Sequence, residues 1–270
     1  EFLYFIGDLS QRNTHLQTST CQPMTEAVDV PFPNRKLVPA ESIGDDETPV
    51  VIASCGSYNP IHTGHIAMFT DAKAALEAGT AKPASIPGAV RVVGGFLSPV
   101  NDGYGKAGLA KAPARIALCE AALEDNDWIS VEPWEAAQPG FVRSYVVLSR
   151  ILEKAQAEYA QMGAAGARVA SRLRIVFLCG ADLFESFYRP GCWELGLLRR
   201  IFTEMLLLAV CREGSADPRD RMRAAEPLTH KDSPGVTLDM AQFTDNVAVL
   251  QALDGKCASS TLVRTRLANG

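Results

Sequence analysis

Short apolar runs alternate along the chain with longer segments that mix apolar and polar residues. We interpret the apolar runs as strands, the longer ones buried on both faces of a sheet. The predicted strands cover residues 49–54, 89–97, 128–132, 174–179, 206–211, 235–238 and 247–250. The predicted helices cover residues 66–76, 113–125, 141–162 and 217–226, with a last helix after Ser259. Because strands and helices alternate, we predict an α/β fold, a doubly wound, Rossmann-like parallel sheet with helices on both faces.

Helical spacing indicates which side of two helices faces the core. In the first helix Ile66, Phe69, Ala72 and Leu76 fall on one face, and Gly79 is placed to cap the C-terminal end. In the helix over 141–162 the expected buried face consists of Val142, Tyr145, Val146, Ser149 and Leu152. The small residues at 163–170 are expected to form a flexible connection.

The first 48 residues differ from the rest of the chain. They are rich in Thr, Gln, Pro and acidic residues and show no periodicity. We therefore expect residues 1–48 to form a poorly ordered N-terminal extension. No internal repeat is present, so residues 49–270 are expected to form a single domain.

A motif lies between the first strand and the first helix, at residues 55–65, with the sequence CGSYNPIHTGH. Gly56 lets the backbone approach a ligand closely. The start of the helix offers free N–H groups and the positive end of a dipole, which suits a phosphate. His62 and His65 can donate hydrogen bonds to phosphate oxygens there. A glycine-rich turn alone is common, and a lone histidine at such a turn is more often a helix cap.

Three further stretches could carry chemistry, each with an ordinary alternative. Asp182 follows the strand over 174–179 and either accepts hydrogen bonds from a ribose or an amide, or caps a helix. The loop over 98–106 follows the carboxyl end of another strand. Ser259 and Arg264 put a capping hydroxyl and an arginine on the first turns of the last helix, which predicts a second anion site. The alternative is that the Arg264 side chain is solvated and binds no anion.

Composition narrows the class of protein. The chain has 270 residues, 47% of them hydrophobic, and a net charge of −5, which suits one α/β domain and argues against general nucleic-acid binding. No apolar run has the length of a membrane span, and residues 1–6 are too short for a signal peptide. The seven cysteines are scattered, without a CxxC pair. They indicate reduced thiols in an intracellular protein, cytoplasmic or nuclear, rather than a zinc site or a disulfide framework.

Taken together and in order, these stretches resemble the eukaryotic-type nicotinamide/nicotinate mononucleotide adenylyltransferases of the HxGH nucleotidyltransferase superfamily. The resemblance runs from about Val50 to Leu267. It rests on Gly-Ser-Tyr-Asn-Pro with His-Thr-Gly-His, on Ser-Pro-Val, on Trp134-Glu135, on Gly-Ala-Asp-Leu and on Ser-Ser-Thr-x-x-Arg. It implies transfer of the adenylyl group of ATP to nicotinamide or nicotinate mononucleotide, which forms NAD or deamido-NAD and pyrophosphate.

The resemblance also implies roles for individual residues. His65, His62 and Arg264 would be the catalytic residues. The residues implied in ATP binding are Gly56, Ser57, Tyr58, His62, His65, Gly180, Asp182, Ser259, Ser260, Thr261 and Arg264. The residues implied in mononucleotide binding are Ser57, Tyr58, Lys106, Trp134, Glu135 and Trp193. Trp134 and Trp193 would flank the pyridine ring, and core packing is their alternative. The family often has a lysine directly after the tyrosine of the Ser-Pro-Val loop, where this chain has Gly105 followed by Lys106.

The implied chemistry needs no protein nucleophile, because the phosphate of the mononucleotide attacks the α-phosphorus of ATP. No residues are assigned as protein ligands of a metal, and Mg²⁺ is expected to arrive with ATP. A homo-oligomer is expected, with neither nucleic acid nor membrane as a partner. One alternative is another HxGH transferase, with pantetheine phosphate or riboflavin phosphate as acceptor, against which Trp134 and Trp193 argue. The other is a non-catalytic nucleotide-binding or chaperone-like protein, against which His62, His65 and Arg264 argue.

Overall fold

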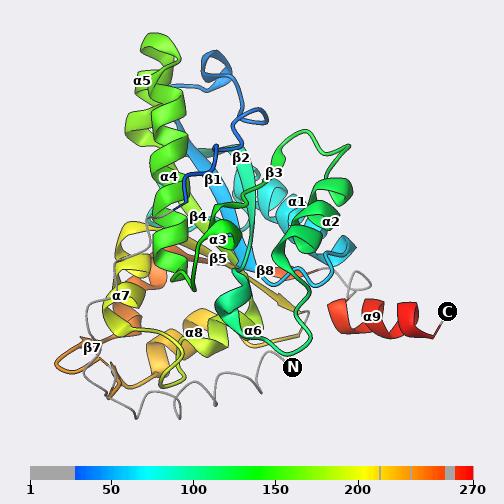
Figure 1. Cartoon of the computed structure of the whole chain (residues 1–270). Helices are drawn as coiled ribbons and strands as arrows, with labels where there is room; N and C mark the ends of the chain where they lie inside the picture. The colour runs from blue at the N-terminus through cyan, green and yellow to red at the C-terminus, as the bar shows by residue number, and fades with distance from the viewer. Residues whose placement is uncertain (1–27, 213, 232, 253–258, 270) are drawn as a thin grey trace, which may run out of the picture.

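Six parallel strands form the central sheet in the order β3-β2-β1-β4-β5-β8 (Figure 1). The computed structural model describes residues 28–212, 214–231, 233–252 and 259–269. The strands are β1 (Glu47–Gly56), β2 (Ala89–Pro99), β3 (Ile129–Val131), β4 (Arg174–Gly180), β5 (Leu206–Arg212) and β8 (Val247–Ala252). Two short strands, β6 (Leu228–Thr229) and β7 (Thr237–Leu238), pair separately and antiparallel. The predicted parallel sheet is confirmed.

The order of the strands locates a switch point. From β1 the chain moves outward through β2 to β3, then returns past β1 to β4 and continues in the other direction. At this point residues 50–53 of β1 pair in parallel register with residues 174–177 of β4. In open sheets of this kind ligands bind beyond the carboxyl ends of the strands at the switch point. Gly56 and Gly180, which end these two strands, therefore mark the expected place of a site.

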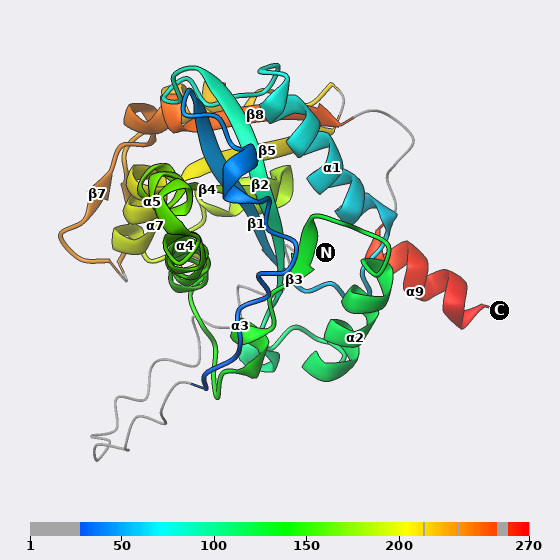
Figure 2. The same ribbon diagram turned by 90° about the horizontal axis from the view of Figure 1, so that it is seen from above.

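Helices cover both faces of the sheet, as predicted. Figure 2 shows α4 (Ser144–Ala160), α5 (Gly163–Arg172) and α7 (Leu195–Glu204) on one side and α1 (Thr63–Glu77) and α2 (Ala112–Ala122) on the other. The shorter helices are α3 (Trp134–Ala137), α6 (Ala181–Ser186), α8 (Pro218–Ala224) and α9 (Ser260–Ala268). Three 3₁₀ segments complete the described elements: η2 (Ala40–Ser42), η3 (Asp102–Tyr104) and η4 (Met240–Asn246).

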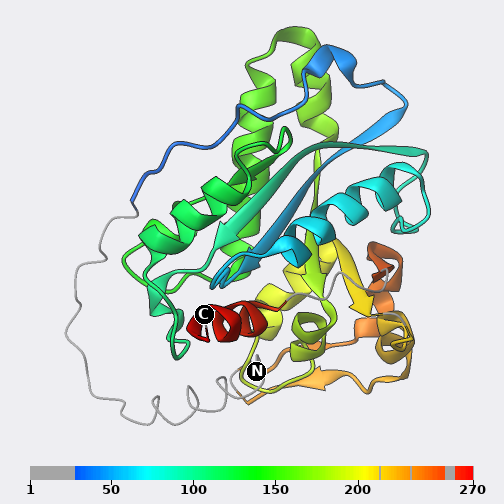
Figure 3. The same ribbon diagram turned by 90° about the vertical axis from the view of Figure 1, so that its right-hand side faces the viewer.

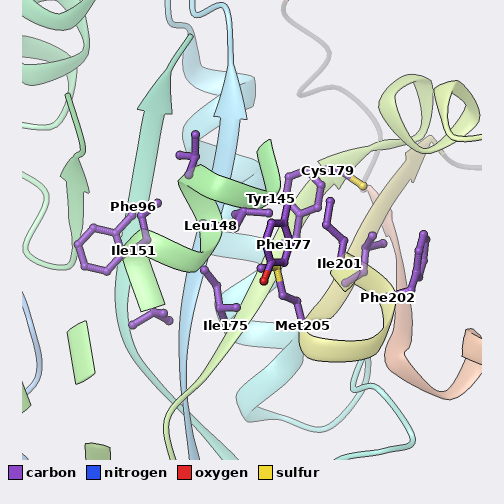
Figure 4. Close-up of a cluster of buried hydrophobic side chains, with 14 of the residues drawn as sticks. Phe96, Tyr145, Leu148, Ile151, Ile175, Phe177, Cys179, Ile201, Phe202 and Met205 are labelled. Carbon is purple, nitrogen blue, oxygen red and sulfur yellow. The ribbon is translucent and has the colours of Figure 1, made fainter. Parts of the chain in front are cut away.

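The sheet separates two hydrophobic clusters. On the α4 side Ile175 and Phe177 of β4 pack with Leu148 of α4 and Phe202 of α7 (Figure 4). On the α1 side the alternate β4 residues Val176 and Leu178 pack in a cluster with Phe69 and Leu76. A strand covered on both faces has no solvent side, which is why these strands read as continuous apolar runs.

The first helix follows its predicted pattern. Phe69, Ala72 and Leu76 are buried, and Ile66 packs against the same cluster. Gly79 follows the helix with φ +72°, a left-handed conformation that favours glycine.

The expected face of the helix over 141–162 is partly wrong. Helix α4 begins at Ser144, and it buries Tyr145, Val147, Leu148 and Ile151. Val146, expected inside, is 42% exposed. Because apolar residues stand next to one another at 145–148, their spacing agrees with more than one helix face, and packing on the sheet selects between them.

The flexible connection expected at 163–170 is also wrong, because these residues lie in helix α5. Val169 is buried against the α4 side of the core. A Cβ atom added at Gly166 would clash with the carbonyl oxygen of Tyr159 in α4. The small residues therefore permit close packing of two helices rather than flexibility.

Helix α7 was absent from the sequence prediction. Its buried residues Leu195, Leu198, Ile201 and Phe202 do follow helical spacing. Its N-terminus is capped by Glu194, whose side chain accepts hydrogen bonds from the backbone N–H groups of Gly196 and Leu197 at 2.7 and 2.8 Å.

Residues 28–48 differ from the poorly ordered extension that was expected. The backbone N–H of Val38 donates to the carbonyl of Val93 at 2.9 Å, and the Lys36 ammonium donates to two carbonyls near the end of α2 and in β3. Phe32 packs its ring on Phe96 with 4.9 Å between ring centroids, and Ala40 is buried. This segment crosses the edge of the domain through backbone and single side-chain contacts, which leave no periodic pattern in a sequence. Residues 1–27 lie outside the described residues.

Within the described part of the chain, no helix combines the length and the apolar character needed to cross a bilayer.

Candidate functional site

The turn after β1 is held by its own side chains. Tyr58 has φ +43°, an uncommon conformation for a residue with a side chain. Its buried hydroxyl donates to the carbonyl of Ser54 at 3.0 Å. Asn59 donates from Nδ2 to the carbonyl of Gly108 at 2.8 Å and accepts from the N–H of Ala110 at 3.1 Å. The side chain of Tyr58, predicted to line the ligand site, therefore supports the turn from inside the protein.

His62 and His65 lie together where α1 begins. Their rings stack with centroids 3.7 Å apart, and the edge of Tyr58 meets His65 at 5.0 Å. The backbone N–H of His62 donates to Nδ1 of His65 at 3.2 Å, so His65 carries its proton on Nε2, which stays available as a donor.

Burial keeps both imidazoles neutral at neutral pH. Burial lowers the pKa of His62, and burial together with neighbouring His62 lowers the pKa of His65 to about 3. A neutral imidazole donates one hydrogen bond without the strong hydration of a full charge, which suits contact with a phosphate oxygen.

Two buried polar atoms at this turn have no hydrogen-bond partner among the described residues: Oγ of Ser57 and Nδ1 of His62. Buried polar groups are nearly always paired in folded proteins. A polar ligand at the turn would supply the missing partners.

Helix α9 meets the same turn from far along the chain (Figure 3). The Ser260 hydroxyl donates to the carbonyl of Pro60 at 2.9 Å, and the Arg264 guanidinium donates to the carbonyl of Asn59 at 2.7 Å. Arg264 also donates to Oγ1 of Thr261 at 3.0 Å, while Ser259 caps the helix. The structure thus places Ser259 and Arg264, which were predicted to form an anion site, beside the turn that carries His62 and His65.

A pocket with about 760 Å³ of empty volume, including space open to solvent, lies beside this turn. Its walls come from five separate segments: the end of β1 with Ser57, the loop from Val100 to Tyr104, Glu135 of α3, residues 141–145, and residues 183–201. Four residues predicted to bind ligand, Gly56, Ser57, Glu135 and Trp193, line it.

Glu135 and Trp193 enter this pocket in different ways. Glu135 is 2% exposed, accepts a hydrogen bond from the Ser98 hydroxyl at 2.9 Å, and has its pKa raised by burial to about 8. Its carboxyl group is therefore largely protonated at neutral pH. Trp193 is half-buried, and its indole N–H donates to Oγ of Ser186 at 2.9 Å while its ring meets the edge of Phe187.

Other predicted site residues lie away from the pocket walls. Trp134 packs its ring under the guanidinium of Arg150, 4.8 Å from its centre, and does not line the pocket. Lys106 follows Gly105, whose φ is +71°, and does not line it either. The structure therefore does not bring Trp134 and Trp193 to opposite sides of this pocket.

Gly180 and Asp182 lie at the end of β4. Gly180 caps α6, and Asp182 is exposed on the first turn of that helix. The alternative that Asp182 itself caps the helix is therefore wrong, and its carboxylate faces solvent near the switch point.

Sequence reasoning missed Arg115 completely. Its side chain is fully buried in α2, and it donates to the carbonyls of Ser57 at 2.9 Å, Val100 at 2.6 Å and Ala110 at 2.8 Å. It also pairs with Asp102 at 3.1 Å. The Arg115 guanidinium is thus bonded to Ser57 and Val100, which belong to two different walls of the pocket. Its only sequence signal is a charged residue in a predicted helix, which normally indicates a solvated face.

Asn101 was missed as well. Its Nδ2 donates to the carbonyl of Gln138 at 2.5 Å, and its Oδ1 accepts from the N–H of Gly103 at 2.6 Å. It joins the loop after β2 to the end of α3, and so sets the distance between Tyr104 and Glu135.

The described residues contain no group of three or more His, Cys, Asp or Glu side chains that could hold a metal ion.

The chain is similar in sequence to known proteins. Residues 53–266 match a family model described as cytidylyltransferase-like. A nicotinamide/nicotinic acid mononucleotide adenylyltransferase of Oryza sativa is 36% identical over 191 residues, which cover 70% of this chain and 70% of the relative. The enzyme of that name from Arabidopsis thaliana is 34% identical over 69% of this chain and 71% of the relative. Nicotinamide/nicotinic acid mononucleotide adenylyltransferase 1 of Saccharomyces cerevisiae is 32% identical over 87% of this chain and 53% of the relative.

Proposed function

We propose that this chain, which belongs to the nicotinamide/nicotinic acid mononucleotide adenylyltransferases, transfers the adenylyl group of ATP to nicotinamide or nicotinate mononucleotide. A phosphate oxygen of the mononucleotide attacks the α-phosphorus of ATP. The bond between the α-phosphorus and the oxygen that bridges it to the β-phosphorus breaks, and pyrophosphate leaves. The product is NAD or deamido-NAD. The observation that carries the proposal is the meeting of His62, His65 and Arg264 at one turn beside the pocket.

The phosphates of ATP are assigned to this turn. The N–H groups at the start of α1 and the Nε2 proton of His65 are donors for phosphate oxygens. Arg264, held at the carbonyl of Asn59, supplies a positive charge at the same turn. Together they stabilise the charge that develops on the leaving pyrophosphate, while Gly180 and Asp182 are assigned to the adenosine side.

The mononucleotide is assigned to the pocket. Its phosphate would lie near Ser57, whose buried hydroxyl has no partner among the described residues. Its ring would extend toward Glu135 and Trp193, which also line the pocket. In this proposal the site positions the nucleophile against the electrophile, so no covalent intermediate with the protein is needed.

Mg²⁺ is proposed to bind with ATP. An ion of this kind usually keeps several waters and is bound through substrate phosphates with few protein ligands. When bound, it offsets phosphate charge. The homo-oligomeric state and the intracellular location remain predictions, and light scattering in solution tests the first.

Pyrophosphate release tests the proposal. The protein is mixed with ATP and Mg²⁺ and with one acceptor at a time: nicotinamide mononucleotide, nicotinate mononucleotide, pantetheine phosphate or riboflavin phosphate. We expect release only with the two pyridine mononucleotides and none without an acceptor. Release with another acceptor would identify a different transferase, and binding of ATP without release would favour a non-catalytic nucleotide-binding protein.

A further inference from the structure

Arg143 brings a positive charge to the acceptor pocket. It immediately precedes α4, and its side chain lines the pocket along with that of Phe141. Its guanidinium carbon lies 5.7 Å from the centre of the Phe141 ring, and the residue is exposed to solvent. No other lysine or arginine lines the pocket among the residues that the structure describes.

Nearby arginines already have carboxylate partners. Arg115 pairs with Asp102, and Arg150 pairs with Glu132, each at 3.1 Å. The Arg143 side chain forms no ion pair and no hydrogen bond with any described residue, and its guanidinium packs over the Phe141 ring. Its charge is therefore available to a ligand.

The acidic groups of the pocket do not cancel this charge. Both oxygens of Glu194 are bonded to N–H groups at the start of α7, where the helix dipole also offsets the negative charge. Glu135 is bonded to the Ser98 hydroxyl in a buried setting that favours its neutral form. Among the described residues, the pocket thus offers an anion one cation without an ion-pair partner, while both carboxyl groups of its wall already accept hydrogen bonds.

We infer that Arg143 makes this site selective for the acid mononucleotide, by pairing with the carboxylate that replaces the amide on the pyridine ring. The inference rests on the proposed function, and it specifies which of the two acceptors the pocket favours. The two acceptors have nearly the same shape, so discrimination between them has to come from charge. A guanidinium forms charge-assisted hydrogen bonds with a carboxylate that a neutral amide oxygen only partly replaces.

Steady-state kinetics with both acceptors test the inference. We expect the wild type to favour nicotinate mononucleotide by about tenfold in kcat/KM, the size expected when one charged hydrogen bond replaces a neutral one. R143Q should remove most of this preference by raising KM for the acid more than KM for the amide. R143K should retain part of the preference, and R35Q, at an exposed arginine outside the pocket, should retain all of it.

Calorimetric titration of each mononucleotide into wild type and R143Q separates this inference from the proposed function. Acid-selective binding that R143Q abolishes supports the inference even if no pyrophosphate is released. An unchanged acid-to-amide ratio in R143Q, or equal losses for both ligands, overturns the inference while leaving an active adenylyltransferase in place. Binding of neither mononucleotide overturns both.

Discussion

The two ends of the proposed cleft are built in contrasting ways. The phosphate end is one contiguous stretch, residues 55–65, joined by helix α9. Its rings are positioned by local contacts, Tyr58 to Ser54 and His62 to His65, although Asn59 and Pro60 are also bonded to distant residues. The acceptor pocket is assembled from five segments and held by contacts between residues far apart, such as Arg115 to Ser57. Substitutions at the phosphate end should therefore change chemistry more than stability, whereas substitutions around the pocket should change both.

The largest expected effect is that of His65→Ala. Loss of one donor to the transition state typically lowers kcat by about 10²–10⁴. Because His65 is held by neighbours in its own turn, the melting temperature and the affinity for the mononucleotide should change little. Turnover, a thermal melt and acceptor binding are measured beside Thr63→Ala, an exposed position in the same turn. Near wild-type turnover would remove His65 from the mechanism.

Arg115→Met should be the most destabilising change at the acceptor end. It leaves the buried carbonyl of Val100 and the partly buried carbonyls of Ser57 and Ala110 without the Arg115 donor, and it removes one of the two cations beside Asp102. We expect this loss of charged hydrogen bonds to cost about 2–4 kcal/mol. Denaturant unfolding measures the loss, and kinetics below the melting temperature measure the site.

A stability-matched variant separates positioning from folding. Leu148→Ala removes a buried side chain from the opposite face of the sheet, at a cost of about 2–5 kcal/mol. We expect Arg115→Met, and not Leu148→Ala, to raise KM for the mononucleotide, because only Arg115 contacts Ser57 and Val100. If both variants lose activity in proportion to stability, Arg115 serves the fold alone.

Trp193→Ala should weaken binding of the mononucleotide without affecting ATP. Loss of one stacked ring typically costs about 1–3 kcal/mol, roughly a fivefold to hundredfold rise in Kd. Trp134→Ala is the matched comparison, because Trp134 packs under Arg150 outside the pocket and should lower stability more than affinity. Equal losses for both ligands in Trp193→Ala, with a lowered melting temperature, would make Trp193 a core residue.

The smallest expected effect is that of Ser260→Ala at the phosphate end. This change removes the hydrogen bond to Pro60, worth about 1 kcal/mol, and leaves the bond from Arg264 to Asn59 to hold helix α9, which has no buried residue. We expect KM for ATP to rise about fivefold, with kcat and stability retained. Thr265→Ala, exposed on the same helix, is the control. An unchanged KM would show that α9 is placed without this contact.

The contrast between local and long-range contacts explains which parts of the fold and of the site could be predicted from the sequence. The strands, helix α1 and the His62–His65 turn were predictable because their residues interact with near neighbours, which leaves a periodic or contiguous pattern. The buried face of α4 and the packing of α5 were not, since adjacent apolar residues and small residues fit several arrangements. Residues 28–48 were judged by composition, which does not record single backbone contacts such as Val38 to Val93.

The amino-acid sequence by itself determined the alternation of strands and helices, the phosphate turn and the cap at Ser259, because local spacing and turn chemistry govern each of them. Only the tertiary structure decided that Arg115 lies buried between two loops, that Trp134 faces Arg150 while Trp193 faces the pocket, and that Arg143 has no carboxylate partner among the described residues. In these cases the role of a side chain depends on the residues around it. Those residues belong to segments that are too distant in sequence for a local pattern to reveal the contact.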